Sequence, residues 1–336
     1  MHEALYQSAE SGMKVRCHLC PHLCLMAEGK SGICRVRYNR EGTLYTSVYG
    51  RVAAMHSDPI EKKPLYHFFP GSEILSIGTP GCNLHCSFCQ NYHLSHPGRS
   101  DSVRQLAITP VGIVEKAAGI QGNTGIAYTY NEPTVFFEMM LDTATLAKDM
   151  GLKNIVVSNG FISQKPLEEL LTVTDAYNID LKAFDDDFYK KIAGGKLSPV
   201  LDTLKTIYSS GRHLEITFLV IPTLNDSLTQ FIQMTEWIST ELSADVPLHL
   251  SRYFPAWKMD LPPTPVPLLQ KMARTARQNL NYVYMGNVAG DNYSSTLCTM
   301  CGQPVIERSG YSVRITGLTD SGTCTQCGSP VPIVMQ

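Results

Sequence analysis

Three cysteines in one short loop are the residues of this chain whose types and spacing indicate chemistry most directly. Cys82, Cys86 and Cys89 lie within the stretch TPGCNLHCSFCQN. A structural zinc ion takes four ligands, and an ordinary cubane iron–sulfur cluster is held by four thiolates. Three thiolates on a cubane leave one iron open to a molecule that carries amine and carboxylate groups. The spacing predicts a catalytic 4Fe–4S cluster, with a site completed by a distant fourth ligand as the alternative.

The remaining cysteines form two sets of four near the two ends of the chain. The set nearer the C-terminus consists of two Cys-x2-Cys-Gly pairs around a predicted hairpin: Cys298, Cys301, Cys324 and Cys327. Two such pairs supply the four thiolates of a zinc ribbon, and a rubredoxin-like iron would use the same geometry. We expect a structural zinc ion that stabilises a tail too small to form its own core.

The N-terminal set consists of three closely spaced cysteines and one remote cysteine: Cys17, Cys20, Cys24 and Cys34. Zinc sites more often use two separated pairs, whereas the irons of a cubane present several corners to one loop. His18 and His22 lie beside these cysteines, and we interpret them as bystanders rather than ligands. The sequence leaves two alternatives for this set, an auxiliary iron–sulfur cluster and a structural zinc ion.

The composition excludes several classes of protein. Charged residues make up 17% of the 336 residues and the formal net charge is -2, so we expect no overall attraction toward nucleic acid. The chain shows no apolar run of membrane-spanning length and no secretory pattern near its first residue. Grouped cysteines in such a chain indicate metal sites rather than disulfides. We expect a cytoplasmic protein in a reducing compartment, without a membrane partner.

From Glu73 onward the sequence alternates apolar strands with amphipathic helices. The predicted strands are Ile74–Gly78, Ile126–Tyr130, Asn154–Ser158, Ala176–Leu181, Leu214–Ile221 and Pro247–Ser251. One predicted helix begins after Thr109. Six further helices are predicted over residues 134–150, 167–171, 188–192, 200–208, 228–238 and 268–279. Six βα units predict an α/β fold with a parallel sheet, and they are too few for the closed eight-unit barrel. We therefore expect an open partial (β/α)6 barrel with its chemistry at the carboxyl ends of the strands.

Three units are predicted along the chain. Residues 1–72 form a small cysteine-rich cap with a hairpin that turns at 39–42, residues 73–290 form the partial barrel, and residues 291–336 form a zinc-ribbon-like tail. The stretch Met55–Gly71 contains three prolines, and we predict it to be irregular. Its adjacent lysines, Lys62 and Lys63, could face the substrate because the segment bridges cap and barrel, but we favour the alternative that they belong to a solvated loop.

Polar residues follow several of the predicted strands. Asp180 and Lys182 are two apart, so both point into the barrel, either as catalytic groups or as an interior ion pair. His249 and Arg252 lie on the sixth strand near the expected barrel mouth, where Arg252 could bind a carboxylate or phosphate.

The loop after the first strand resembles the radical S-adenosylmethionine superfamily, because it carries Cys-x3-Cys-x2-Cys and Phe88 directly before the last cysteine. The resemblance implies that a reduced cluster cleaves S-adenosylmethionine to methionine and a 5′-deoxyadenosyl radical, which abstracts hydrogen from a substrate. It also implies a set of cofactor-binding residues: Phe88 at the adenine, Asn131, Glu132 and Pro133 at the amino group, and Ser158, Asn159 and Gly160 at the ribose. Asn131 stands where the superfamily has glycine, and Val157 where related activases have aspartate.

A narrower resemblance covers nearly the whole chain. The segments CHLCPHLC, DPIEKKPLYHFFPG, GCNLHCSFCQN and TYNEPT, followed by the terminal ribbon, resemble the AmmeMemoRadiSam-system radical enzymes, which are related to pyruvate formate-lyase activating enzymes. The resemblance implies a Memo-like protein and its companion as partners. A reductase, flavodoxin or ferredoxin would supply electrons.

The predicted function is therefore hydrogen abstraction from a small molecule or a protein side chain. One alternative is an activase that installs a glycyl radical on a partner enzyme. The other is a metal-bound scaffold or electron carrier without catalysis.

Overall fold

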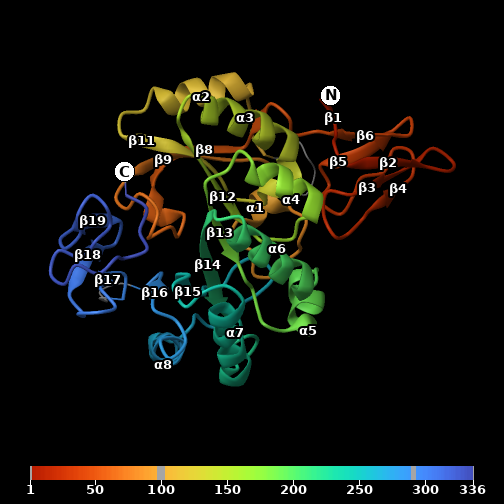
Figure 1. Cartoon of the computed structure of the whole chain (residues 1–336). Coiled ribbons are helices and arrows are strands. Elements are labelled where there is room, and N and C mark those ends of the chain that lie inside the picture. The colour runs from red at the N-terminus through yellow and green to blue at the C-terminus, as the bar shows by residue number, and fades with distance from the viewer. Residues whose placement is uncertain (1, 97–102, 289–292, 336) are drawn as a thin grey trace.

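A curved sheet of eight strands forms the centre of the computed structural model, which describes residues 2–96, 103–288 and 293–335 (Figure 1). The strands lie in the order β16-β15-β14-β13-β12-β11-β9-β8. Their bounds are β8 Ala54–Pro59, β9 Glu73–Gly78, β11 Asn123–Tyr128, β12 Lys153–Ser158, β13 Ala176–Asp180, β14 His213–Val220, β15 Leu248–Arg252 and β16 Val283–Gly286. All neighbours from β9 to β16 pair in parallel, and β8 pairs antiparallel to β9 at one edge.

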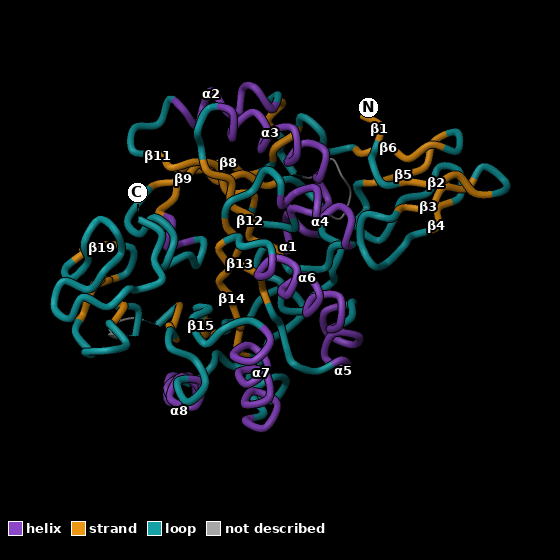
Figure 2. Tube along the Cα trace, viewed as in Figure 1, coloured by secondary structure: helices purple, strands orange, loops and turns teal. Residues whose placement is uncertain are grey.

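Helices cover the convex side of this sheet (Figure 2). They are α2 Pro110–Ala118, α3 Phe137–Asp149, α4 Gln164–Leu171, α6 Leu197–Ser209, α7 Leu228–Glu241 and α8 Val266–Ala276. Two short helices, α1 Tyr92–Ser95 and α5 Asp186–Phe188, lie in the connections after β9 and β13. Thr109 caps α2 through its side chain, and Pro110 occupies the first helical position, as the sequence predicts. Within the described residues, no helix combines the length and apolar character needed to cross a bilayer.

The α/β class and the parallel sheet are confirmed, with two differences in detail. The prediction that Met55–Gly71 is irregular is wrong for its first residues, which belong to β8. The strand β16 was not predicted at all. β8 has a largely polar sequence and is held by backbone pairing at an edge, while β16 has only four residues. Neither strand carries a long enough apolar pattern to be recognised from sequence.

The N-terminal unit consists of two small antiparallel sheets that lie to one side of the central sheet (Figure 1). Its strands are β1 His2–Glu3, β2 Gln7–Glu10, β3 Lys14–Cys17, β4 Leu25–Met26, β5 Arg37–Arg40 and β6 Thr43–Thr46. The strand β7 (Arg51–Val52) pairs with β10 (Leu106–Ala107) of the barrel segment. Arg37 attaches the unit to α3, because its two terminal nitrogens lie 3.0 and 2.9 Å from the carboxylate oxygens of the buried Glu138.

The C-terminal unit is a three-stranded antiparallel sheet of β17 Thr296–Leu297, β18 Pro304–Ser309 and β19 Ser312–Ile315. The segment after β8 joins it to the barrel. Arg308 donates to the carbonyl of Tyr66 over 2.6 Å, and the backbone of Val334 pairs with that of His67 and Phe69. The boundary predicted at residue 291 lies outside the described residues.

A buried carboxylate between β13 and β15 gathers three histidines. Glu215 is fully buried, and it accepts hydrogen bonds from the ring of His249 at 2.6 Å, the ring of His213 at 2.9 Å and the backbone N–H of His67 at 2.7 Å. The ring of His67 lies 2.6 Å from the hydroxyl of Tyr284 and 3.0 Å from the carbonyl of Pro332. Burial lowers the pKa of His67 to about 3, so this imidazole is neutral in the folded protein.

The low pKa of His67 predicts a loss of stability in mild acid. Between its ordinary value and about 3 the unfolded chain binds one more proton than the folded chain, so the free energy of unfolding falls as the pH falls. From pH 6.5 to 5.5 this group contributes a loss of about 1 kcal/mol. Urea unfolding of the wild type and of His67→Gln at both pH values should show the steeper loss in the wild type. An equal loss of unfolding free energy in the two proteins would show that His67 is not the group responsible.

Candidate active site

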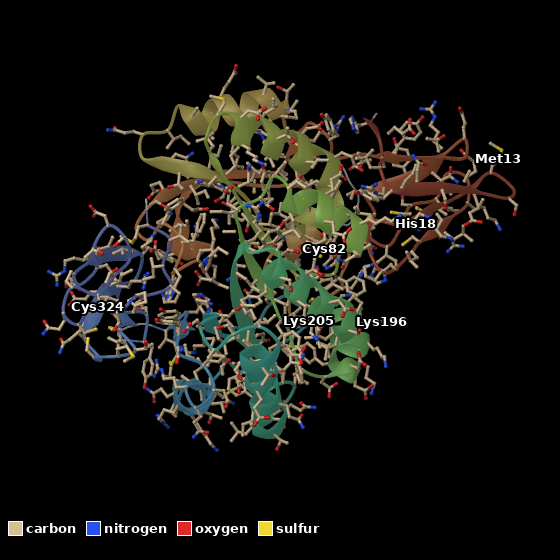
Figure 3. The ribbon with its side chains drawn as sticks, viewed as in Figure 1. Met13, His18, Cys82, Lys196, Lys205 and Cys324 are labelled. Carbon is tan, nitrogen blue, oxygen red and sulfur yellow. The ribbon has the colours of Figure 1, made fainter. Side chains whose placement is uncertain are left out.

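The carboxyl ends of the parallel strands border a cavity of about 940 Å³. This volume lies in the range of sites that hold a cofactor together with a small ligand. Cys82, Cys86, Cys89 and Phe88 line the cavity, and among the described lining residues there is no fourth cysteine. Figure 3 shows Cys82 near the middle of the molecule, between the N-terminal unit with His18 and the C-terminal unit with Cys324.

The cysteine loop is held in place by its backbone. It leaves β9 at Gly78, where a Cβ atom would lie 2.7 Å from the carbonyl oxygen of Thr129, so a side chain does not fit. The N–H of His85 then donates to the carbonyl of Ala193 over 2.7 Å. Ala193 ends the π-helix η4 (Tyr189–Ala193), which follows α5. The loop is therefore attached both to the first strand and to the segment after β13.

The surroundings of the three thiols fit an iron–sulfur cluster. The N–H of Leu84 and the amide of Asn159 lie 3.4 and 3.8 Å from the sulfur of Cys82, and hydrogen bonds to sulfur are typical of such sites. The hydroxyl of Ser87, between the second and third cysteines, is buried without a partner among the described residues. Burial raises the pKa of the Cys86 thiol to about 11, and a bound metal would favour its thiolate form.

Glu132 ties the ends of β11 and β12 together. One of its oxygens accepts from the backbone and hydroxyl of Thr134 at 3.0 and 2.7 Å and from the hydroxyl of Ser158 at 2.8 Å. The other accepts from the backbone N–H of Asn159 at 2.8 Å. Burial raises the pKa of Glu132 and these four donors oppose the rise. The carboxylate lines the cavity, yet it is bound mainly by the chain itself.

The neighbouring candidates are also bound by the chain. Asn131 accepts from the N–H of Thr79 and donates to the carbonyl of Gly81 over 2.7 Å. Asn159 donates to Asn83 over 2.9 Å. Pro133 begins the turn η3 (Pro133–Phe136), and Gly160 has a φ of 70° with no room for a side chain. The structure thus brings Phe88, Asn131, Glu132, Ser158 and Asn159 to one cavity, while Pro133 and Gly160 are not among its lining residues.

Asp180 and Lys182 both line the cavity, with 3.0 Å between their charged atoms. Burial disfavours the ammonium, but Asp180 and Cys86 outweigh it and raise the pKa of Lys182 above its usual range. The ammonium also lies 5.9 Å from the centre of the Phe88 ring. A positive charge therefore stands beside the cysteine loop.

The two candidate site residues on β15, Arg252 and His249, lie in different places, and only Arg252 lines the cavity. Arg252 lines the cavity, where its Nε donates to the carbonyl of Thr264 over 2.8 Å and its guanidinium stacks on Phe254. His249 is not at the barrel mouth, contrary to the sequence-based expectation. It lies three residues earlier on the strand, is buried against Glu215, and is absent from the cavity wall. The physical reason is the buried carboxylate on the neighbouring strand, whose charge requires donors.

Lys62 and Lys63 both line the cavity, and their pairing with Asp58 was missed from the sequence. The prediction of a solvated loop is wrong for Lys63, whose side chain is 3% exposed and lies 2.7 Å from Asp58, and it holds for Lys62 at 48%. Tyr130 donates its hydroxyl to the same carboxylate over 2.7 Å, and the ammonium of Lys63 lies over the Tyr130 ring. Asp58, four residues before Lys62, was the available signal in the sequence.

The C-terminal cysteines converge on a point. Their four sulfurs lie within 4.8 Å of one another, with Cys298 3.6 Å from Cys327 and Cys301 3.8 Å from Cys324. Tetrahedral zinc with Zn–S bonds of about 2.3 Å places sulfurs about 3.8 Å apart. The set can therefore bind one metal ion.

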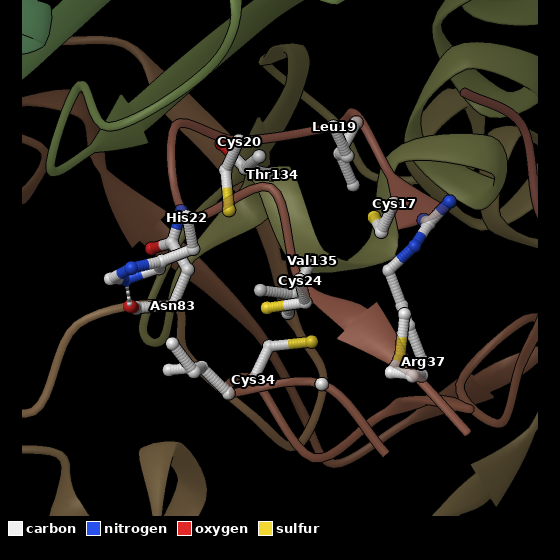
Figure 4. A pocket seen from close by; sticks show the side chains of 13 residues that line it. Cys17, Leu19, Cys20, His22, Cys24, Cys34, Arg37, Asn83, Thr134 and Val135 are labelled. Carbon is white, nitrogen blue, oxygen red and sulfur yellow. Dashed lines mark hydrogen bonds between the residues drawn. The ribbon is translucent and has the colours of Figure 1, made fainter. Parts of the chain in front are cut away.

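The N-terminal cysteines line a separate small cavity of about 20 Å³, and their sulfurs point into it (Figure 4). Apolar residues of the N-terminal unit and Val135 of η3 complete its wall. This small cavity lies next to the central cavity. Asn83 and Thr134 line the small cavity, while Cys82 and Glu132, one and two residues earlier in the chain, line the central one.

The convergence of the C-terminal sulfurs predicts the effect of removing one of them. Cys301→Ser should lower the metal content by about one ion per chain and loosen the C-terminal unit, because the tetrahedron loses a thiolate. Metal analysis and limited proteolysis measure both effects. Met300→Ala, next to it and 74% exposed, should change neither. If Cys301→Ser keeps the full metal content of the wild type, the four C-terminal cysteines do not form a metal site.

The sequence of this chain is similar to those of several known proteins. Residues 76–235 match the Radical SAM superfamily. The chain is 40% identical over 339 residues to an uncharacterized protein of Methanocaldococcus jannaschii, covering 100% of both chains. It is 28% identical over 152 residues to the pyruvate formate-lyase-activating enzyme of Clostridium pasteurianum, covering 44% of this chain and 61% of that enzyme.

Among solved structures, a radical SAM methyltransferase from Sphaerobacter thermophilus has the same fold, with a TM-score of 0.50 at 17% identity over 70% of this chain and 71% of the other. Together with the three-cysteine loop at the mouth of a parallel sheet, the family match shows that residues 76–235 of this chain are a radical SAM domain, and enzymes with this domain use a 4Fe–4S cluster and S-adenosylmethionine.

Proposed function

We propose that Cys82, Cys86 and Cys89 hold the 4Fe–4S cluster and that S-adenosylmethionine and the substrate occupy the same cavity. A reduced cluster held there would supply one electron to the sulfonium of S-adenosylmethionine, whose S–C5′ bond would break to release methionine and leave a 5′-deoxyadenosyl radical for hydrogen abstraction. The observation that supports this function best is the cavity of about 940 Å³, whose described lining residues include three cysteines and no fourth.

The residues around the cofactor have two kinds of role in this proposal. Phe88 is buried at the cavity wall and offers a ring face to the adenine. Ser158 and Asn159 face the ribose, together with the backbone at Gly160. Glu132 acts as a positioning residue, because its oxygens are bound to Thr134, Ser158 and Asn159. Asn131 and Pro133 shape the turn that receives the amino group.

The charged residues of the cavity wall favour an anionic substrate. Lys62, Lys63, Lys182 and Arg252 line it, against the carboxylates of Glu132 and Asp180. Lys63 and Lys182 are each paired with an aspartate, and Lys62 shares Asp58 with Lys63 at 2.8 Å, but Lys62 and Arg252 keep exposed surface. A carboxylate or phosphate on the substrate would neutralise this excess of positive charge. We propose that Arg252 and Lys62 contact that group, and that Asp180 and Lys182 stand near the reacting atoms.

A glycyl-radical activase is the second candidate, and the similarity to a pyruvate formate-lyase-activating enzyme favours it. The two functions differ in the molecule that carries the final radical, which is a glycine of a partner enzyme only in the case of an activase. Incubation of the reduced protein and S-adenosylmethionine with a glycyl-radical enzyme should give a doublet in electron spin resonance only if the chain is an activase.

The C-terminal metal and the protein partners are also proposals. We propose zinc at Cys298, Cys301, Cys324 and Cys327, because the sulfur separations match tetrahedral zinc. The AmmeMemoRadiSam resemblance further suggests a Memo-like protein and its companion. A flavodoxin, ferredoxin or reductase would be the electron donor.

Removal of a cluster ligand tests the site assignment. Cys86→Ala should abolish formation of 5′-deoxyadenosine from S-adenosylmethionine by the anaerobic, dithionite-reduced protein, because two thiolates do not hold the cluster. Cys301→Ala, outside the cavity, should retain this activity. Chromatography of the nucleoside product measures both. Turnover by the Cys86 variant would refute the assignment.

The role of Glu132 predicts a combined loss of stability and binding. In Glu132→Gln an amide N–H₂ replaces one acceptor, so at least one donor of Thr134, Ser158 or Asn159 loses its partner. We expect a loss of about 1–3 kcal/mol in unfolding free energy and binding of S-adenosylmethionine weakened on the order of tenfold. Urea unfolding and equilibrium dialysis measure these effects. Glu168→Gln, on the exposed face of α4, is the matched control. Unchanged binding in Glu132→Gln would contradict the positioning role.

A further inference from the structure

The N-terminal cysteines differ in spatial arrangement from the C-terminal cysteines. Among the described residues, the C-terminal set is the one group in which at least three metal-ligating atoms come within 4.8 Å of one another. The N-terminal set lines a common cavity without such convergence: Cys17, Cys20, Cys24 and Cys34. The central set of Cys82, Cys86 and Cys89 does not converge either, and the superfamily uses a cluster there. Thiolates on separate corners of a cubane lie further apart than four thiolates on one ion.

A buried cation faces this cavity with an unused donor. Arg37 is 2% exposed and lines the cavity beside Cys17 (Figure 4). Its terminal nitrogens are occupied by Glu138 and the carbonyl of Leu5, but its Nε has no partner among the described residues. An unpaired buried N–H is costly and indicates a missing acceptor. Sulfur atoms of a bound cluster would accept this hydrogen bond, and the guanidinium would offset their negative charge.

The central cysteine loop packs directly on the N-terminal set. Gly81 has a φ of 98°, and a Cβ there would lie 2.9 Å from the carbonyl oxygen of Cys34. Asn83 lines the N-terminal cavity, and its carbonyl lies 2.7 Å from Nε2 of His22. The two residues that flank Cys82 therefore both contact the N-terminal unit. A single stretch of backbone separates the two groups of sulfurs.

We propose that Cys17, Cys20, Cys24 and Cys34 bind a second, fully ligated 4Fe–4S cluster, and that this site passes single electrons to the central one. With four thiolates it has no open iron for a substrate, so its chemistry is one-electron exchange. A flavodoxin- or ferredoxin-type donor reduces the N-terminal site by one electron. That electron then reduces the central site, and the N-terminal site returns to its oxidised state. The electron exchange rests on the function proposed above, but the second cluster does not.

Metal analysis of a variant with an intact N-terminal unit tests the second cluster. In Cys82→Ala/Cys86→Ala/Cys89→Ala, purified and reconstituted without oxygen, we expect about four irons and one zinc per chain, against about eight irons in the wild type. The reduced variant should show a cluster signal in electron spin resonance that S-adenosylmethionine does not change. A variant without iron, or with two zinc ions, would overturn the proposal.

Reduction kinetics test the electron exchange. In Cys20→Ala/Cys24→Ala, the central spin signal should form at least tenfold more slowly with reduced flavodoxin and within twofold of the wild-type rate with dithionite, which enters the open cavity. His22→Phe should keep about eight irons and slow only the flavodoxin reaction, by several-fold. Unchanged flavodoxin rates, or equal losses with both reductants, would refute the exchange. Formation of 5′-deoxyadenosine by the dithionite-reduced wild type tests the function proposed above, independently of the electron exchange.

Discussion

The buried carboxylate of Glu132 is the interaction on which the site depends. It accepts four hydrogen bonds, two from its own turn and two from the end of the next strand. An unpaired charge at this depth would cost several kcal/mol, so the two strand ends are held in one relative position. That position places the Asn159 amide against Asn83 and the sulfur of Cys82. The geometry of the cysteine loop therefore follows from a contact between two neighbouring strands.

The same chain of contacts continues outward to the N-terminal unit. Asn83 receives the ring of His22, and Gly81 lies against the carbonyl of Cys34. The ion pair of Arg37 with Glu138 fixes the unit to α3, the helix that follows the Glu132 turn. The cap is thus attached to the beginning of the loop that carries the active cysteines and to α3. Its position is part of the site.

Much of the fold could be predicted because the signals are local. Apolar strands, helix caps such as Thr109 and the cysteine spacings need only a few consecutive residues to be recognised. The predictions for Lys63 and His249 were wrong because burial depends on residues distant in sequence. Lys63 is buried by its pairing with Asp58 and Tyr130, and His249 by the carboxylate of Glu215 on the neighbouring strand. The strand β16 was missed because four residues carry too little pattern.

By itself the sequence determined the three sets of cysteines, the loop that carries the active set, and the alternation that builds a parallel sheet. These properties follow from order along the chain, which the covalent backbone preserves. Only the tertiary structure decided how far apart the sulfurs of each set lie, and that the N-terminal and central sets share a wall. It also decided which charges face the cavity. Distances between atoms from different strands depend on how the strands pack, and packing is a property of the whole molecule.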